Sequence, residues 1–204
     1  MEKSYNLDIV RADDTSALSN FMCGVPFMDE FIHDPEKGLA KFIKLRLSYL
    51  WIVFEYGKAV AFFALSKDAL VLNNEDRRNL ESKEKSTAAL PSPCDADKFW
   101  DKEKYPAIEI DYLAVCKEKR DNPNDYLGTY IIEEICRITY VDFFSATMFL
   151  TVEALDTKEY SAVEFYKKCG FQFSDKAQNK YIYNTINGNQ PTTRRMYKII
   201  LPLD

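Results

Sequence analysis

Histidine is almost absent from this chain of 204 residues, and long apolar runs are absent altogether. Because His33 is the single imidazole, a histidine-based metal cluster is disfavoured, and any Ser-His-Asp triad would rest on that one residue. We therefore expect no metal, and a solvated His33 near a helix end. Apolar runs such as AVAFFAL at 59–65 are far too short to span a membrane. The opening residues MEKSYNLDIV lack the apolar core of a secretory signal, so we expect a cytoplasmic protein without a membrane partner.

Closely paired cysteines are also missing. The five cysteines contain no CxxC pair and are scattered over the sequence, at Cys23, Cys94, Cys116, Cys136 and Cys169. An odd, scattered set of this kind is typical of reduced thiols in the cytoplasm and not of a disulfide framework.

The chain also lacks an excess of positive charge. The chain has 27 Lys and Arg against 32 Asp and Glu, which gives a net charge of -5 and a pI near 5.1. Proteins that bind a phosphate backbone over a broad surface are usually basic, so nucleic acid is disfavoured as a partner. The one dense basic run, KGLAKFIKLR at 37–46, leaves aminoacyl-tRNA open, although a solvated helix face is the commoner use of such a run.

Apolar side chains are plentiful enough for a sizeable core. Hydrophobic residues make up 47% and aromatic residues 14% of the chain, which predicts one globular domain over residues 1–204. The stretch 73–104 differs, because it is dense in mixed charge and carries Pro91 and Pro93. We interpret it as a surface insertion that is partly helical.

Hydrophobic periodicity predicts alternating strands and helices. The strongest signal is a β-hairpin formed by two apolar runs that flank Gly57-Lys58. Leu127, Ile131, Ile135 and Ile138 lie at helical spacing and define one buried face of a helix near 125–142. The remaining expected elements are a strand at 5–11, a turn at Cys23-Gly24 followed by helical spacing through Phe27, Phe31 and Ile32, a helical stretch at 38–47, strands at 105–115 and 146–154, a helix at 158–170 and strands at about 171–183 and 194–200.

Four short segments together resemble the GNAT superfamily of N-acetyltransferases, in the bacterial subgroup that includes tRNA-acetylating toxins. They are SNFMCGVPFMDEFI at 19–32, YPAIEIDYLAV at 105–115 with LGTYIIEEI at 127–135, SAVEFYKKCGF at 161–171 and TTRRMYKI at 192–199. The resemblance implies an α+β, GNAT-like acyl-CoA N-acyltransferase fold, with a mixed central sheet of about six or seven strands flanked by helices. It also implies acetyl transfer from acetyl-CoA, as co-substrate, to a primary amine.

The resemblance further implies where acetyl-CoA would bind. Its pantetheine would pair with the strand end at Leu113, Ala114 and Val115, and an N–H near Val115 would polarise the thioester carbonyl. Its pyrophosphate would lie at the helix start, at Asn124, Asp125, Tyr126, Leu127, Gly128 and Thr129. Glycine is scarce in this loop: RDNPNDYLGTYII at 120–132 holds one, where the family pattern has two. Asp125 also adds negative charge there, and the alternative interpretation is a helix simply N-capped by Asn124 or Asp125.

For catalysis, the tyrosine of the F-Y-x-x-x-G-F segment often donates a proton to the departing thiolate in this family, and it matches Tyr166. Glu109 lies six residues before Val115, the spacing at which some protein-modifying members of the family place a glutamate, so the resemblance makes it the candidate base. It shares a strand face with Asp111, and two close carboxylates would raise the pKa of one of them. The alternatives are that Tyr166 packs in the core and that Glu109 and Asp111 face solvent.

Two functional hypotheses remain open from the sequence. The first is an acetyl-CoA-dependent N-acetyltransferase that acts on a small-molecule or protein amine, as a monomer or as a homodimer. The second is a GNAT-fold protein with lost or weakened CoA binding that acts as a binding or regulatory module.

Overall fold

The computed structural model describes residues 6–78, 102, 104–122, 125–141, 147–186, 188 and 192–200. Most of the predicted insertion at about 73–104 lies outside these residues, although 74–78, near its start, are helical. Asn124 also lies outside them. The described chain clusters into two compact units, which we call the first unit (Met1–Ser66 with Ile110–Glu133) and the second unit (Lys67–Glu109 with Glu134–Asp204).

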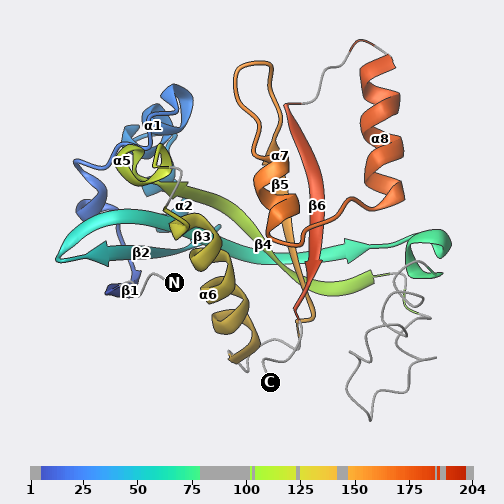
Figure 1. Ribbon diagram of the computed structural model, residues 1–204, viewed down its shortest axis with the longest axis horizontal. Coiled ribbons are helices and arrows are strands. Elements are labelled where there is room, and N and C mark those ends of the chain that lie inside the picture. Colours follow the sequence, from blue (N-terminus) through green and yellow to red (C-terminus); the bar gives the residue numbers. More distant parts are fainter. Residues whose placement is uncertain are drawn as a thin grey trace. The chain divides into compact units, whose positions relative to one another are not determined.

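Within the described residues, six strands form one mixed sheet whose order follows the chain: β1 (Leu7–Ala12), β2 (Tyr49–Glu55), β3 (Lys58–Val71), β4 (Lys104–Val115), β5 (Phe149–Leu155) and β6 (Thr193–Ile199) (Figure 1). The labelled helices are α1 (Pro26–His33), α2 (Leu39–Lys44), α5 (Lys117–Arg120), α6 (Leu127–Val141), α7 (Val163–Lys168) and α8 (Asp175–Ile186), and a 3-10 helix spans Ser16–Leu18. This arrangement confirms the predicted α+β class and the predicted size of the sheet.

The first unit contains the predicted β-hairpin. β1, β2 and β3 pair antiparallel, with Leu7 opposite Glu55 and Glu55 opposite Lys58. The turn lies one residue earlier than predicted, at Tyr56-Gly57, where φ is 49° and 77°. Two successive positive φ values are typical of a type I′ turn, whose twist matches that of the flanking strands. The run Val60–Leu65 of β3 is buried throughout, so β3 is covered on both faces there.

Aromatic side chains attach α1 and α2 to the strand that follows the insertion. Phe31 of α1 stacks on Tyr112 of β4 at a centroid distance of 4.6 Å, and Phe42 of α2 meets the same ring edge-on at 5.9 Å. His33 is the last residue of α1, is exposed, and its Nε2 lies 2.9 Å from the carbonyl oxygen of Phe21. This confirms its predicted position at a helix end.

The predicted buried face of α6 is largely confirmed. Leu127, Ile131 and Ile135 are each at most 1% exposed, and Ile138 is half-buried. A stripe at steps of four and three residues therefore faces the core along the helix.

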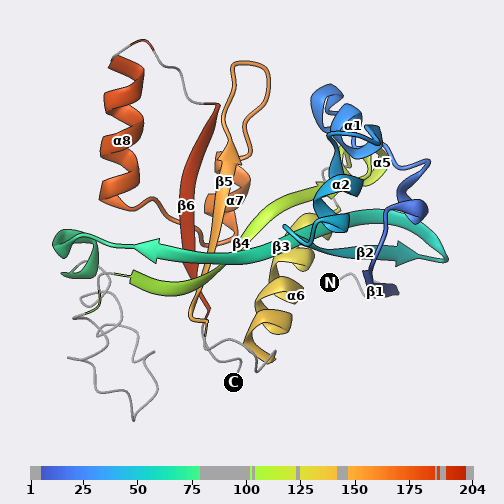
Figure 2. The ribbon, with the colours of Figure 1, turned by 180° about the vertical axis from the view of Figure 1, so that it is seen from behind.

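The second unit has its own core under the β5–β6 pair. Tyr105, Phe149 and Tyr197 meet edge-on at centroid distances of 5.5 and 6.1 Å, and small or aliphatic residues of β3 and β4 complete the cluster. β5 and β6 pair antiparallel, and α8 runs beside β6 in both views (Figure 2).

One predicted strand is wrong. A strand is predicted at about 171–183, but Asp175–Ile186 is helix α8. Ser174 starts this helix: its hydroxyl accepts a hydrogen bond from the N–H of Ala177 at 3.1 Å. This is N-cap geometry, and it satisfies a donor that the first helical turn would otherwise leave unpaired. Before this helix, Gln172 forms an isolated antiparallel β-bridge with Tyr197 of β6.

Removing this cap should weaken the second unit. Ser174→Ala should lower the free energy of unfolding by about 1 kcal/mol, because the Ala177 N–H loses its acceptor in a position that is almost fully buried. Ser174→Thr keeps a hydroxyl and should recover most of that loss in urea unfolding. An equal loss in both variants would mean that the cap does not hold α8.

Candidate functional site

The end of β4 is where the sequence predicted the pantetheine of acetyl-CoA to bind. Ala114 is buried, whereas Leu113 and Val115 are half-buried. The pairing with β3 continues one residue further, because the N–H of Cys116 donates to the carbonyl of Val60 at 2.8 Å. The strand end is therefore firmly placed on its β3 side within the first unit.

The segment between β4 and α6 contains a buried carboxylate. The side chain of Asp125 is 2% exposed, and its Oδ1 accepts a hydrogen bond from the N–H of Leu127 at 3.1 Å. The ammonium of Lys119 lies 3.7 Å from Asp125 and 2.7 Å from Glu55 at the end of β2. Because the N-terminus of a helix carries partial positive charge, the carboxylate of Asp125 is stabilised there as a bound anion would be.

The other predicted cofactor-binding residues of this segment differ in exposure. Tyr126 is 65% exposed, Leu127 is buried in the core, and Gly128 and Thr129 are half-buried in the first turn of α6. The structure thus brings Asp125 to the helix start, as the capping alternative predicted, and leaves the pyrophosphate interpretation as a prediction.

The motif at 19–32 forms a clamp against α5. Both oxygens of the buried Asp29 accept backbone hydrogen bonds, from Cys23 at 2.7 Å and from Gly24 at 2.9 Å. Gly24 has a φ of 77°, and a Cβ there would lie 3.0 Å from the Lys117 side chain. Arg120 of α5 donates to the Cys23 carbonyl at 2.5 Å. The cysteine, glycine and aspartate of the motif therefore fix a turn against α5.

Cys23 takes part in this clamp through its backbone N–H and carbonyl. Burial raises the pKa of its thiol to about 11. Because the thiolate is the nucleophilic form, this cysteine is inert near neutral pH.

The F-Y-x-x-x-G-F segment ends α7 in a Schellman motif. The N–H of Gly170 donates to Lys167, and the N–H of Phe171 donates to the carbonyl of Tyr166 at 2.9 Å. Gly170 has a φ of 84°, which glycine adopts at little cost, and the rings of Phe171 and Tyr166 pack edge-on at 5.2 Å. The spacing of the signature thus follows from how a helix stops.

Tyr166 is 6% exposed and lies between the rings of Phe165 and Phe171. Burial raises the pKa of its phenol, so the hydroxyl stays protonated across the physiological range. A protonated phenol is the form that a general acid needs, and it is equally the form of a packed core tyrosine. Its catalytic role stays a prediction.

The predicted base, Glu109, belongs to an ion-pair cluster of the second unit. Arg195 of β6 donates to Glu109 at 2.9 Å, pairs with Asp68 of β3 and lies 3.6 Å from Glu153. Thr151 adds a hydrogen bond to Asp68 at 2.5 Å. A guanidinium therefore holds Glu109, an arrangement that the sequence did not indicate.

Asp111, two residues further along β4, lies in the first unit and has different partners. Its carboxylate accepts hydrogen bonds from the hydroxyls of Ser48 at 2.5 Å and Ser66 at 2.9 Å. The expectation that Glu109 and Asp111 simply face solvent does not hold, because both carboxylates are engaged by neighbouring side chains.

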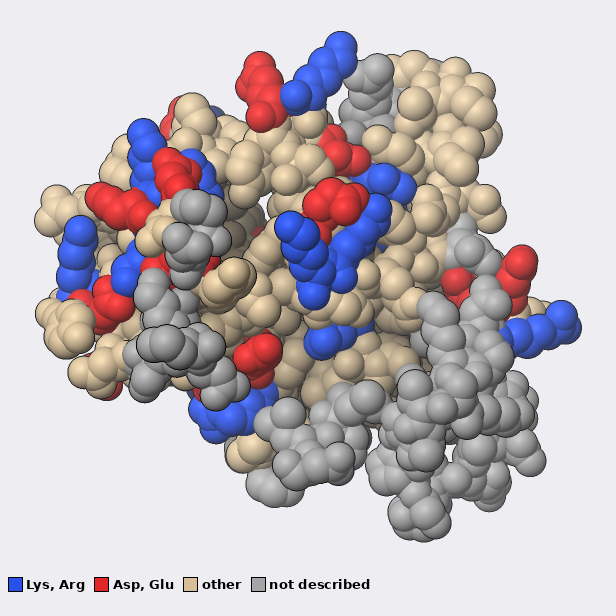
Figure 3. All heavy atoms as spheres, viewed as in Figure 1, with Lys and Arg blue, Asp and Glu red and all other residues tan. Residues whose placement is uncertain are grey.

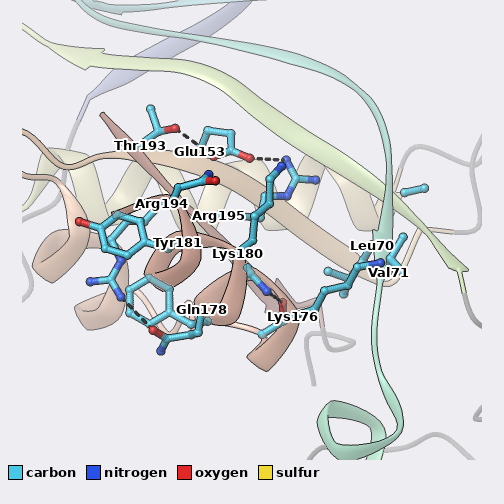
Figure 4. Close-up of a pocket in the computed structure, with 15 residues that line it drawn as sticks. Leu70, Val71, Glu153, Lys176, Gln178, Lys180, Tyr181, Thr193, Arg194 and Arg195 are labelled. Carbon is cyan, nitrogen blue, oxygen red and sulfur yellow. Dashed lines mark hydrogen bonds and ion pairs between the residues drawn. The ribbon is translucent and has the colours of Figure 1, made fainter. Parts of the chain in front are cut away.

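A groove of about 380 Å³ lies between α8, the end of β3 and β6 in the second unit (Figure 4). The guanidinium of Arg194 lies over the ring of Phe173 at 4.0 Å and over that of Tyr181 at 4.6 Å. The same side chain donates to Gln178 at 3.0 Å. Sequence reasoning missed this groove, because 171–183 was interpreted as a strand. The one signal that the sequence offered was Arg194, which belongs to the motif at 192–199.

The predicted residues are thus divided between the two units. Leu113 to Val115 and Asp125 to Thr129 belong to the first, whereas Tyr166 and Glu109 belong to the second. In the part of the chain that the structure describes, we find no cluster of metal-ligating side chains and no helix long and apolar enough to cross a membrane.

No family model and no curated protein matches the sequence. Solved structures match over most of the chain. A tyrosine-to-phenylalanine mutant of KacT is 17% identical, with a TM-score of 0.60 and 95% of each chain covered. AtaTR bound with acetyl-CoA is 16% identical, with a TM-score of 0.56, 95% of this chain and 94% of that chain covered. AtaT complexed with acetyl-methionyl-tRNA is 21% identical, with a TM-score of 0.53, 82% of this chain and 87% of that chain covered.

The complex of AtaT with a tRNA corrects one expectation. An acidic overall charge disfavoured nucleic acid as a partner, yet a protein of similar structure binds one. Overall charge reports on the average surface, whereas binding depends on the field of a local patch, so the net charge does not make nucleic acid an unlikely partner. The strand order and the structural likenesses together show that the chain has a GNAT-like acyl-CoA N-acyltransferase fold, as its four sequence motifs predicted.

Proposed function

We propose that the protein is an N-acetyltransferase that transfers the acetyl group of acetyl-CoA to a primary amine. The observation that carries this proposal is the order of β4, α5 and α6 in a GNAT-like fold. The end of β4, at Leu113–Val115, precedes α6, whose first turn contains Leu127, Gly128 and Thr129. That order supplies the strand and the helix N-terminus that a pantetheine and a pyrophosphate require. AtaTR, which shares the fold, is solved with acetyl-CoA.

The two halves of this site differ in how well they fit the co-substrate. The end of β4, where Leu113 and Val115 are half-buried, would pair with the pantetheine. The start of α6 fits less well, because the carboxylate of Asp125 already accepts a hydrogen bond from the N–H of Leu127 and would repel a pyrophosphate. The half-buried Gly128 and Thr129 complete this first turn.

In the proposed reaction, the neutral amine attacks the thioester carbonyl, the C–S bond breaks and the thiolate of CoA leaves. The backbone N–H of Val115 would stabilise the charge on the carbonyl oxygen. Tyr166 would give its proton to the leaving thiolate. Its raised pKa keeps the phenol protonated at neutral pH but also makes it a weaker acid, so this transfer would have to be driven by the charge that develops on the sulfur. The amine would lose its proton to Glu109 or to a water, and the water is favoured while Arg195 holds Glu109.

Among primary amines, the α-amine of an aminoacyl-tRNA is the acceptor to test first, because AtaT is solved with acetyl-methionyl-tRNA. On the face that Figure 3 shows, the described acidic and basic side chains are interspersed. A local basic run does exist on and around α2, and all four of its cations are exposed: Lys37, Lys41, Lys44 and Arg46. This run could contact phosphates without a basic protein overall.

A second function, as a binding or regulatory module, is favoured by one observation. Asp125 satisfies part of the α6 N-terminus from within the chain, which is what a helix that binds no phosphate would need.

Calorimetry separates these two functions. We expect acetyl-CoA and CoA to bind with micromolar dissociation constants, because the strand end and the first turn of α6 both take part in binding. Pantetheine, which lacks the nucleotide and its phosphates, is the matched control and should bind far more weakly. If neither acetyl-CoA nor CoA gives heat with the folded protein, the module function stands instead.

Salt dependence tests the nucleic-acid acceptor. Binding of an aminoacylated tRNA should weaken steeply as salt rises, and the double variant Lys41→Gln/Lys44→Gln should reduce the slope of log K against log salt by about 0.7–0.9 for each phosphate that these lysines neutralise. Lys180→Gln on α8 is the matched control and should leave the slope unchanged. A flat salt response of the unmodified protein would remove tRNA as the acceptor.

Tyr166→Phe tests the proposed acid. Only a hydroxyl is removed, so the fold and the affinity for acetyl-CoA should persist while turnover falls by roughly 10²–10⁴, the usual contribution of a positioned acid. Tyr56→Phe is the control, because Tyr56 is 86% exposed in the hairpin turn. Glu109→Gln should reduce turnover less, since a water can relay the proton. Unchanged turnover in Tyr166→Phe, or a large loss of thermal stability, would make Tyr166 a packing residue.

A further inference from the structure

We propose that Asp125 is a built-in anion that occupies the phosphate-binding end of α6, so that CoA binds only when this carboxylate is displaced. The inference rests on the proposed function, since it assumes that the pyrophosphate uses the start of α6. It adds a property that the function does not require, namely that the affinity for CoA is held down by a residue of the chain itself.

Burial is the first observation behind this inference. The Asp125 side chain is 2% exposed, although charged carboxylates are almost never buried unless they are compensated. Its compensation comes from the N–H of Leu127 at 3.1 Å and the ammonium of Lys119 at 3.7 Å. The Asp125 backbone is held as well, because its N–H donates to the carbonyl of Asn122 at 3.0 Å. The carboxylate is thus directed into the helix end and away from solvent.

The local charge balance is the second observation. Lys119 donates to Glu55 at 2.8 Å, and this hydrogen bond, followed by the charges of Glu55 and Asp125, raises the pKa of its ammonium although burial opposes it. One lysine therefore lies between the carboxylates of Glu55 and Asp125. A pyrophosphate placed beside both carboxylates would meet like charge at short range in a poorly hydrated site.

These observations imply two positions of the Asp125 carboxylate. In the closed state it accepts the hydrogen bond from the N–H of Leu127; in the open state it has left and a phosphate takes its place. The apparent affinity for CoA is then the intrinsic affinity multiplied by the fraction of molecules in which the Asp125 carboxylate has left the helix start.

Neutralising this one carboxylate should release the site. Asp125→Asn keeps the size of the side chain and an oxygen for the Leu127 N–H, but it removes the negative charge. We expect its affinity for CoA to exceed that of the unmodified protein by about tenfold or more, which corresponds to the loss of one close charge–charge repulsion. Asp125→Ser, which also accepts a hydrogen bond as an N-cap-type residue, should act in the same direction if the asparagine variant folds poorly.

Asp121→Asn is the matched control. Asp121 lies in the same segment, its side chain is 50% exposed, and it pairs with Arg120. The substitution removes the same formal charge from the same region, so it should change CoA affinity less than about twofold, because exposed charges are screened by solvent and salt.

The experiment is calorimetric titration of the folded full-length variants with CoA, and with inorganic pyrophosphate as a probe for the phosphate interaction alone. A gain confined to the Asp125 variants, for both ligands, supports the inference. If the unmodified protein binds CoA and Asp125→Asn binds it no better, the inference is wrong while the proposed function stands. If none of the variants binds CoA, both are wrong, because removing the carboxylate has not opened a site.

Discussion

The carboxylate of Asp125 is buried where the chain enters α6, and a buried charge has to be compensated where it lies. Its partners connect three parts of the first unit: the helix start through Leu127, α5 through Lys119 and the end of β2 through Glu55. The segment after β4 is therefore held by internal ion pairs, whereas a phosphate-binding loop leaves its N–H groups for the ligand.

The sequence motifs owe their spacing to backbone geometry more than to catalysis. Asp29 follows Gly24 by five residues because its carboxylate must reach back to the N–H groups of the turn, and Gly170 follows Tyr166 by four because α7 stops in a left-handed residue. Such motifs identify a fold well, since turns and caps are what the fold needs. They identify the chemistry less well, because Tyr166 would occupy the same position as a reactive group or as a packed ring.

The second unit balances its charges in a similar way. The guanidinium of Arg195 lies among the carboxylates of Asp68, Glu109 and Glu153, and Arg194 lies over two aromatic rings beside the groove. The carboxylate proposed as the base is thus held by a cation, and in the first unit the helix end proposed for a phosphate is held by an anion. Both groups are satisfied from within their own unit.

The sequence by itself determined most of the strand and helix order, the hairpin and the buried face of α6, because these follow from periodicity and turn chemistry over a few residues. It failed at α8, which was predicted to be a strand although Ser174 caps a helix there. The partners of the charged groups lay beyond it: Lys119 pairs with a glutamate 64 residues away, and Arg195 with one 86 residues away. Only the tertiary structure decides such pairs, since no local pattern specifies which distant side chain will compensate a buried charge.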